Sequence, residues 1–287
     1  MTGVELTIQV LTCSALVGLL GAVGLRLTYG EVRAALARCR FAAVVLVNFV
    51  AIPALAVVAV MSFGLSREVG TGMILLAAAP FAPVVPVFAR MARAELALAA
   101  ALTGIFPLLS AVLTPIAARG ALWIVARGDV VRFDMWMSLA VLLATISLPL
   151  AAGVFVRHRA PTLGHRLLKP VEVISEAIGA ASLAFVTVTQ FGSIVNLGWQ
   201  SWLAMALLSE ISFGLGWRVG GPDSGSRQVV ALGTSNRNIA LALLVAVQSF
   251  HGTEIASAVV GNGLLLIGFG LLHVAWWRFG LGERRHA

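Results

Sequence analysis

The run Gly233-Thr234-Ser235-Asn236-Arg237-Asn238 places hydrogen-bonding side chains at consecutive positions. Arginine donates in a planar fork that fits carboxylates, and asparagine both donates and accepts hydrogen bonds. Apolar residues flank the run, Val229 to Leu232 before it and Ile239 to Val247 after it, so it interrupts a segment of membrane-spanning length. Non-helical backbone at membrane depth persists only where protein or a water-filled cavity satisfies its amides, and secondary transporters bind solutes at such breaks. We therefore expect a substrate site lined by Thr234, Ser235, Asn236, Arg237 and Asn238.

Arg237 is the most costly residue of the run, because insertion scales place a mid-helix arginine at about 2.5–3.5 kcal/mol. Two interpretations follow. In one, its guanidinium and the amides at the start of the helix from Ile239 face an anionic substrate. In the other, Arg237 forms a buried ion pair with Glu210 of the preceding apolar segment. Glu210 lies near the middle of that segment, so it either binds and releases a coupling proton or serves as a fixed ion-pair partner.

A second break is expected in the segment from Thr71 to Ala92, which contains Pro80, Pro83 and Pro86. Each internal proline removes a backbone hydrogen bond and clashes with the preceding turn, at about 3 kcal/mol per interruption. The chain therefore has one broken segment in each half, with Gly233 marking the second. Corresponding interruptions in two halves are typical of inverted-repeat transporters.

The elements that hold these breaks are membrane helices. Of the residues, 60% are hydrophobic and 11% charged, with a mean hydropathy of +0.98, whereas a soluble domain carries about 25% charged residues. Apolar stretches of about 20 residues indicate helices rather than the short strands of an outer-membrane barrel. Residues 1–28 contain Glu5 and no basic N-terminal region, which predicts a retained first helix rather than a signal peptide. We predict an all-α integral membrane protein with nine segments: 4–28, 41–64, 70–92, 95–118, 134–156, 171–196, 199–217, 228–250 and 254–279.

The formal net charge of +8 reports membrane topology rather than nucleic-acid binding. Basic residues concentrate in alternate connections, and in membrane proteins such connections lie on the cytoplasmic side. We therefore expect a multi-pass protein of the cytoplasmic (inner) membrane with its N-terminus outside and its C-terminus in the cytoplasm. Cys13 and Cys39 lack the spacing of a metal site or a disulfide framework and are interpreted as free thiols. The basic connections are 29–40, 90–95, 157–169, 218–227 and 278–287.

The two breaks divide the chain into two expected repeats. Residues 1–118 form the first, with four helices and a break at 80–86, and residues 119–133 form a periplasmic linker. Residues 134–287 form the second repeat, with five helices and a break at 233–238.

Over nearly the whole chain, the order of these motifs resembles the bile acid:sodium symporter family, within the bile/arsenite/riboflavin transporter superfamily. Family members have ten helices, or nine when the first is absent, and this chain is similar to the nine-helix form. The resemblance implies a core domain, in which the two broken helices cross, and a panel domain that moves against it. The stretches that carry the resemblance are Gly24 to Thr28, Val32 to Leu36, Gly72 to Pro80, Glu95 to Pro115 and Gly233 to Ala246.

The chain departs from this family at the sodium ligands. Val85 and Pro86 stand at the family's Ser-Asn positions in the first break, Ala231 and Ser235 replace an acidic residue and a glutamine in the second, and Ala99 replaces a hydroxyl. Because sodium needs several oxygen ligands, we expect no cofactor and no dependence on these sodium sites. Since the family's core binds a cation in this region, Arg237 is interpreted as a tethered replacement for it. The oxygen-bearing candidates that remain for a sodium ligand are Thr103, Thr234 and Ser235, and Thr103 also joins the expected substrate site.

The sequence thus predicts a secondary active transporter that moves a small or amphipathic organic anion across the lipid bilayer by alternating access. The alternatives are a proton-coupled or uniport anion carrier, and a membrane sensor or binding protein that kept the fold without transport. An enzyme is not expected, because the sequence offers no facing pair of catalytic acids and no metal cluster. The pattern is compatible with a monomer and leaves the identity of the substrate open.

Overall fold

A computed structural model describes residues 3–26, 28–126, 133–250 and 253–280. Within these ranges all regular structure is helical, which confirms the all-α prediction. The predicted segments at 70–92 and 199–217 correspond to a broken pair, α5 (Arg67–Ala77) with α6 (Val85–Ala92), and to α12 (Trp199–Val219). The number of nine spans stays a prediction. Among the described residues, the seven stretches that are long and apolar enough to cross a membrane are Gly3–Arg26, Phe41–Ser62, Leu96–Val125, Met135–Arg159, Pro161–Thr189, Ser224–Ser249 and Glu254–Phe279.

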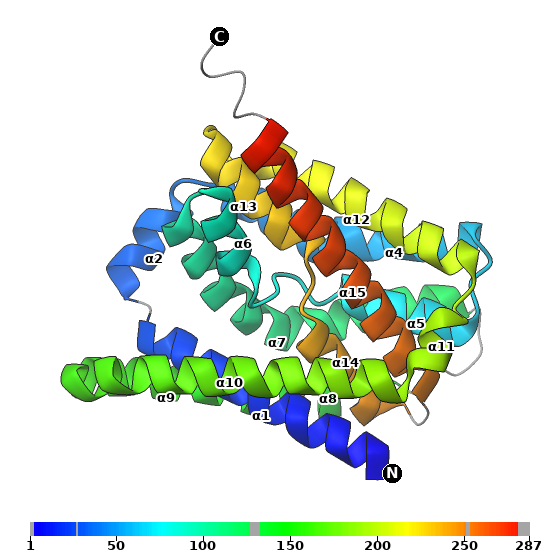
Figure 1. The fold of residues 1–287 in the computed structure, drawn as a ribbon, viewed down its shortest axis with the longest axis horizontal. Coiled ribbons are helices and arrows are strands. Elements are labelled where there is room, and N and C mark those ends of the chain that lie inside the picture. The colour runs from blue at the N-terminus through cyan, green and yellow to red at the C-terminus, as the bar shows by residue number, and fades with distance from the viewer. Residues whose placement is uncertain (1–2, 27, 127–132, 251–252, 281–287) are drawn as a thin grey trace.

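Three helical runs pack together along one side of the molecule and are called the panel. α1 lies against both α9 and α10, and Figure 1 shows these helices gathered below the rest of the protein. Small residues permit the close approach, because a Cβ added to Gly24 or Gly153 would overlap the backbone of the facing helix. The panel consists of α1 (Gly3–Arg26), the run α8 (Met135–Leu142), η2 (Leu143–Ser147) and α9 (Leu148–Arg159), and α10 (Pro161–Thr189).

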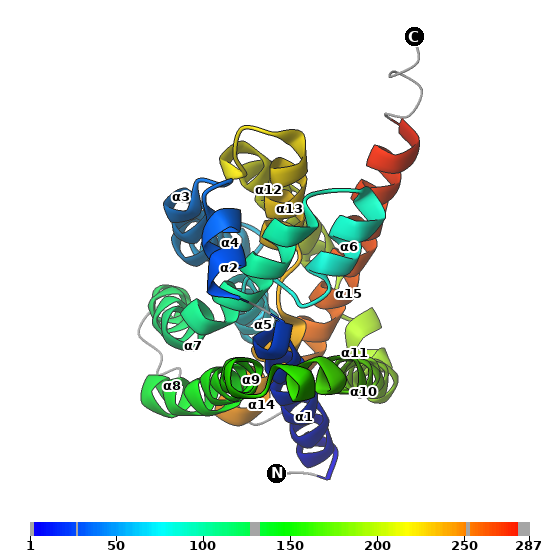
Figure 2. The same ribbon diagram turned by 90° about the vertical axis from the view of Figure 1, so that its left-hand side faces the viewer.

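The remaining helices surround the broken helices and are called the core. α5 packs on α4 and α15, α13 packs on α12, and α14 reaches the panel at α1. Figure 2, turned by 90°, again shows the panel below the core. Besides α5, α6 and α12, the core contains α2 (Tyr29–Leu36), α3 (Phe41–Leu46), η1 (Val47–Ala51), α4 (Ile52–Ser62), α7 (Leu96–Ala126), α11 (Phe191–Val195), α13 (Ser224–Ser235), α14 (Ile239–Ser249), α15 (Thr253–Ala275) and η3 (Trp276–Gly280).

α10 begins well before the predicted start at residue 171. α9 ends at Arg159 and α10 begins at Pro161, since proline suits the first turn of a helix, where its missing N–H costs nothing. The segment 157–169 is therefore helical apart from this turn, and His165 contacts Arg157 across it (Nε2 to Nη1, 2.6 Å). Glu172 and Glu176 consequently lie inside a long helix rather than at a helix start.

α7 also extends beyond its predicted end at residue 118. It continues to Ala126 with Pro107 and Pro115 inside it, so residues 119–126 of the expected linker are helical. Residues 127–132 of that linker lie outside the described residues.

The two breaks cross and hydrogen-bond to each other through their backbones. The Phe81 N–H donates to the Gly233 carbonyl (3.2 Å), and the Ala82 N–H donates to the Asn236 carbonyl (3.0 Å). In return, the Asn238 N–H donates to the Ala79 carbonyl (2.7 Å). Each break thus supplies the partners that the other lacks, which is a way for non-helical backbone to persist inside a membrane protein.

Side-chain caps mark where three of the four half-helices begin, and at α5 the Ser66 hydroxyl accepts from the Val69 N–H (3.3 Å). The Asp223 carboxylate accepts from the Ser226 N–H (2.8 Å) at the start of α13, and this hydrogen bond holds the pKa of Asp223 below its usual range. The Asn238 Oδ1 accepts from the Leu241 N–H (3.1 Å) at the start of α14. All three follow the preference of helix N-termini for Ser, Asp and Asn.

The Phe81 ring packs closely at the crossing. Its backbone has a φ of 57°, a conformation that residues with a side chain rarely adopt. Its ring stacks on Phe106 with centroids 4.1 Å apart, and a Cβ added to Gly233 would overlap this ring. Gly233 is therefore required for the close approach of the two breaks.

We expect Gly233→Ala to lower the free energy of unfolding by about 1–3 kcal/mol, because overpacking forces the Phe81 ring and its backbone to shift. Thermal unfolding of the purified protein in detergent measures the effect. The matched control is Gly268→Ala in α15, where an added Cβ meets no atom within 4 Å and helix propensity alone favours alanine. Equal melting temperatures for the two variants would contradict this packing argument.

Candidate solute-binding site at the crossover

The C-terminal end of α5 leaves three carbonyl oxygens without a partner in the helix, and each finds a donor elsewhere. Pro80 has no N–H, and the Phe81 N–H is used by Gly233. The Ala77 carbonyl accepts from Arg237 Nη1 (3.1 Å), the Ala78 carbonyl accepts from Thr114 Oγ1 (2.7 Å), and the Ala79 carbonyl accepts from the backbone of Asn238. Arg237 therefore has a defined structural contact at the crossover.

A second carbonyl that Arg237 satisfies comes from the π-helix η1. There the Ile52 N–H donates to the Val47 carbonyl, and the next residue, Pro53, has no N–H to offer to Asn48. The Asn48 carbonyl accepts from Arg237 Nη1 instead (3.4 Å). Pro53 thus leaves the Asn48 carbonyl free to accept a hydrogen bond from Arg237, which lies in another span.

Arg237 itself is 4% exposed. Its Nη1 is held between two carbonyl oxygens, whereas Nη2 has no hydrogen-bond partner among the described residues. The guanidinium lies at the C-terminal end of α5, where the partial negative charge of the helix favours a cation. This arrangement compensates part of the cost of burying the charge.

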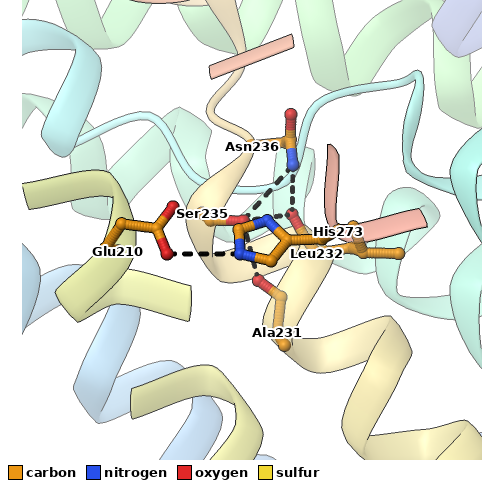
Figure 3. Close-up of polar contacts among 6 residues, drawn as sticks. All are labelled: Glu210, Ala231, Leu232, Ser235, Asn236 and His273. Atoms are coloured by element: carbon orange, nitrogen blue, oxygen red, sulfur yellow. Dashed lines mark hydrogen bonds and ion pairs between the residues drawn. The ribbon is translucent and has the colours of Figure 1, made fainter. Parts of the chain in front are cut away.

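Glu210 is not the partner of Arg237. Its Oε2 lies 3.2 Å from Nε2 of His273 on α15, and its side chain is 45% exposed. Figure 3 shows this contact, and the His273 ring also stacks on Phe213 with centroids 3.6 Å apart. No ion pair between Glu210 and Arg237 occurs within the described ranges, so the alternative of a pair locking two helices is not what the structure shows.

The other residues of the polar run are buried and mostly satisfy backbone groups. Thr234 Oγ1 accepts from Asn48 Nδ2 (3.1 Å), and Ser235 Oγ donates to the Ala231 carbonyl (3.0 Å). Asn236 Nδ2 donates to the Leu232 carbonyl (3.1 Å), as Figure 3 shows. The amide orientations of Asn236 and Asn238 are fixed by these bonds and by the α14 cap. In the described part of the chain, Asn236 Oδ1 and Asn238 Nδ2 remain without partners.

A cavity of about 330 Å³ lies between the panel and the crossover, and we call it the inner cavity. Its wall is mainly apolar. The panel contributes α1 and α10, where Thr12 and Ser182 hydrogen-bond to each other (2.9 Å). The core contributes the first break and the polar residues Asn236, Arg237 and Asn238. Of the predicted site residues, these three and Pro83 therefore meet at one cavity.

A second cavity of about 190 Å³, the vestibule, adjoins the inner cavity. The two share Leu19, Pro83, Val87 and Glu176 in their walls. Thr103 lines the vestibule, where its hydroxyl donates to the Ala99 carbonyl in the same helix (2.7 Å). The vestibule is also lined by Pro86 and by the charged residues Arg26, Arg90, Lys169 and Glu172.

The remaining predicted residues lie elsewhere. Thr234 is fully buried in the core with Asn48, and Ser235 lines a very small cavity with Arg237. Pro80 is buried at the end of α5. Glu210 lines neither the inner cavity nor the vestibule.

The four half-helix ends give the crossover an electrical polarity. α6 and α14 begin there, and residues of both beginnings, Val84 with Ile239 and Ala240, line the inner cavity. α5 and α13 end there, and the α5 end faces Arg237. Helix N-termini carry partial positive charge and C-termini partial negative charge. The inner cavity therefore favours a negative group, and Arg237, whose Nη1 binds the end of α5, also forms part of its wall.

Sequence reasoning undervalued Asn48 and Glu176. Asn48 is not among the site residues predicted from the sequence, yet its carbonyl and its amide both reach the second break. The sequence feature that could have indicated it is Pro53, five residues later in an apolar span. Glu176 was assigned to a helix start, and it lines both cavities. The signal for Glu176 was Pro161, which allows α10 to begin earlier.

Comparison with known proteins identifies one family. The family model described as the Sodium Bile acid symporter family matches residues 13–197, which is more than half of the chain. The match includes the first break, whereas the polar run at 233–238 lies beyond it. No curated protein matches the chain.

We expect Arg237→Ala to lower the free energy of unfolding by about 1–3 kcal/mol for each carbonyl left without a donor, Ala77 and Asn48 being the two. Arg237→Lys keeps the charge but offers a compact ammonium rather than a planar fork. We therefore expect it to lower the free energy of unfolding by less than Arg237→Ala does. Thermal unfolding in detergent measures both. Arg90→Ala, which removes an exposed arginine, serves as the control and stays within about 0.5 kcal/mol of the wild type. An Arg237→Ala protein as stable as this control would refute the carbonyl-binding role.

Proposed function

This chain belongs to the sodium bile acid symporter family, a family of transporters, and we propose that it is a secondary carrier of a small or amphipathic organic anion. The observation that carries the proposal is the apolar inner cavity at the beginnings of α6 and α14. Half-helix N-termini at the crossing point of a transporter face anionic groups of the substrate. The apolar wall fits the body of an amphipathic molecule, since its burial is favourable.

The donor supplied by Asn238 supports an anionic head group. Its Nδ2 is buried with no described partner and belongs to a residue that lines the inner cavity. Its orientation is fixed, because Oδ1 of the same amide caps α14. A carboxylate or sulfonate oxygen at the α14 N-terminus therefore finds an amide donor in addition to the positive helix end.

In this proposal the carrier needs no sodium at the crossover. Half-helix C-termini and unwound carbonyls hold the coupling cation in other transporters of this architecture, and here the Ala77 and Asn48 carbonyls accept from Arg237. Val85 and Ala231, which replace oxygen-bearing family residues, are buried and apolar. The guanidinium acts as a cation tethered to the protein, and its charge does not leave with each transport cycle.

The arrangement of panel and core supports alternating access. The inner cavity and the vestibule both lie between α1 and α10 on one side and the crossover on the other. Rocking the panel against the core would expose the same cavity to the opposite side of the membrane. By the distribution of basic residues, the vestibule with Arg26, Arg90 and Lys169 faces the cytoplasm. The protein is then a multi-pass protein of the inner membrane with an external N-terminus.

We expect proteoliposomes containing the protein to take up radiolabelled taurocholate, whose sulfonate stays ionised, at the same initial rate in sodium, potassium or choline buffer. Liposomes without protein serve as the blank. Counterflow, in which unlabelled taurocholate inside drives entry of the label, tests carriage without any ion gradient. A strict sodium requirement would contradict the tethered-cation account, and absence of counterflow would contradict transport of this anion.

Leu19 on α1 and Val87 on α6 line both cavities from the panel and the core, so linking them tests the rocking motion. We expect a Leu19→Cys, Val87→Cys protein, made with Cys13 and Cys39 replaced by serine, to lose counterflow after treatment with a reducible bifunctional maleimide. Counterflow returns after reduction. The matched control places both cysteines on the panel, at Leu19 and Gly179, where a link leaves the motion free. Full counterflow in the linked panel–core protein would refute alternating access between these two groups.

A further inference from the structure

Glu176 is an acidic residue of the inner cavity whose charge is not compensated by a described contact. It lies near the middle of α10, is exposed, and lines both the inner cavity and the vestibule. Within the described ranges it makes no hydrogen bond or ion pair. Two other acids are paired: Glu172 contacts Arg26 and Lys169, and Glu210 contacts His273.

The charged groups that line the two cavities with Glu176 come from α1, α6, α10 and the second break. In the vestibule they are Arg26 of α1, Arg90 of α6, and Lys169 and Glu172 of α10. In the described wall of the inner cavity, Arg237 is the one ionisable residue besides Glu176. Nη1 of Arg237 donates to the Ala77 and Asn48 carbonyls, so the guanidinium is bound to the core.

An anionic solute in the inner cavity therefore meets a like charge if Glu176 is ionised. Two negative charges that share the mainly apolar wall of one cavity repel each other, because an apolar wall screens charge less than bulk water does. Neutral glutamic acid removes this repulsion and adds an O–H donor. Binding of the anion and binding of a proton at Glu176 then favour each other, and this mutual effect is what couples two ligands thermodynamically.

We propose that Glu176 is the proton-coupling residue and that the chain is a proton–anion symporter; the inference rests on the proposed anion transport. On the side of entry, a hydronium ion transfers one proton to the Glu176 carboxylate, forming an O–H bond, and the anion enters the inner cavity. On the other side the anion leaves, the O–H bond breaks, and water accepts the proton. One proton and one negative charge cross together, so transport of a monovalent anion carries no net charge.

The proposal differs from proton coupling through Glu210, which the sequence suggested. Glu210 lines neither cavity and its carboxylate is already in contact with His273. Protonation of Glu210 would therefore not change the charge that the solute meets. Glu210→Gln is accordingly the matched control for Glu176→Gln, since both substitutions remove one carboxylate charge from a long helix.

The first test is taurocholate uptake by proteoliposomes with an acidic outside and an alkaline inside, with the membrane potential held at zero by potassium and valinomycin. Wild type and Glu210→Gln are expected to accumulate the anion about tenfold per pH unit, the ratio for one proton per anion. Glu176→Gln, which resembles the protonated residue, is expected to lose accumulation driven by the pH gradient, and its counterflow is measured in parallel to show how much carriage remains. Counterflow without any response to the pH gradient in the wild type would overturn the proton coupling and leave the proposed transport intact. Loss of accumulation in Glu210→Gln alone would also overturn it.

The second test needs no substrate. Infrared difference spectra of the purified protein between alkaline and acidic pH report the C=O stretch of carboxyl groups that become protonated. We expect Glu176→Gln to lose part of this band and Glu210→Gln to retain that part. Identical carboxyl bands in the wild type and Glu176→Gln would show that Glu176 does not bind a proton over this range and would overturn the proposal even if taurocholate is not a substrate.

Discussion

The structure depends on the need to satisfy backbone hydrogen bonds inside a membrane. Two helices are interrupted, and each interruption leaves carbonyl and amide groups that lipid cannot satisfy. Because the two breaks cross, each supplies hydrogen-bond partners to the other. Phe81 and Ala82 donate to the second break, and Asn238 donates back to the first. Gly233 permits the required approach because any larger residue would overlap the Phe81 ring.

The crossing also brings together helix ends that carry partial charges. Two half-helices end at it and two begin at it, so both partial negative and partial positive charge gather there. Arg237 lies with the carbonyls of Ala77 and Asn48, and the inner cavity lies with the beginnings of α6 and α14. A protein-borne cation in this place makes a permanent positive charge part of the core. It also explains why a buried arginine is tolerated without a carboxylate partner among the described residues.

The membrane-embedded acids differ in role because their surroundings differ. Glu172 is neutralised by two bases at the vestibule, Glu210 contacts a histidine away from both cavities, and Glu176 stands in the wall where a solute would pass. Their distance along the sequence gives no hint of this difference, since Glu172 and Glu176 are one helical turn apart. What distinguishes them is that Glu172 contacts Arg26 and Lys169 of the panel, whereas Glu176 contacts no charged group among the described residues.

The sequence by itself determined the helical membrane fold, the two breaks and the family resemblance, because hydropathy and proline act locally along the chain. It also located the polar residues that meet at the crossover, Asn236, Arg237 and Asn238. It did not determine where the Arg237 guanidinium points, because that depends on carbonyls freed in other helices by Pro53 and Pro80. Likewise the sequence favoured Glu210 over Glu176. The depth of a residue within a span can be inferred from the sequence, whereas the approach of α10 to the crossover cannot. Tertiary structure alone decided these contacts, because each joins groups from segments distant in the chain.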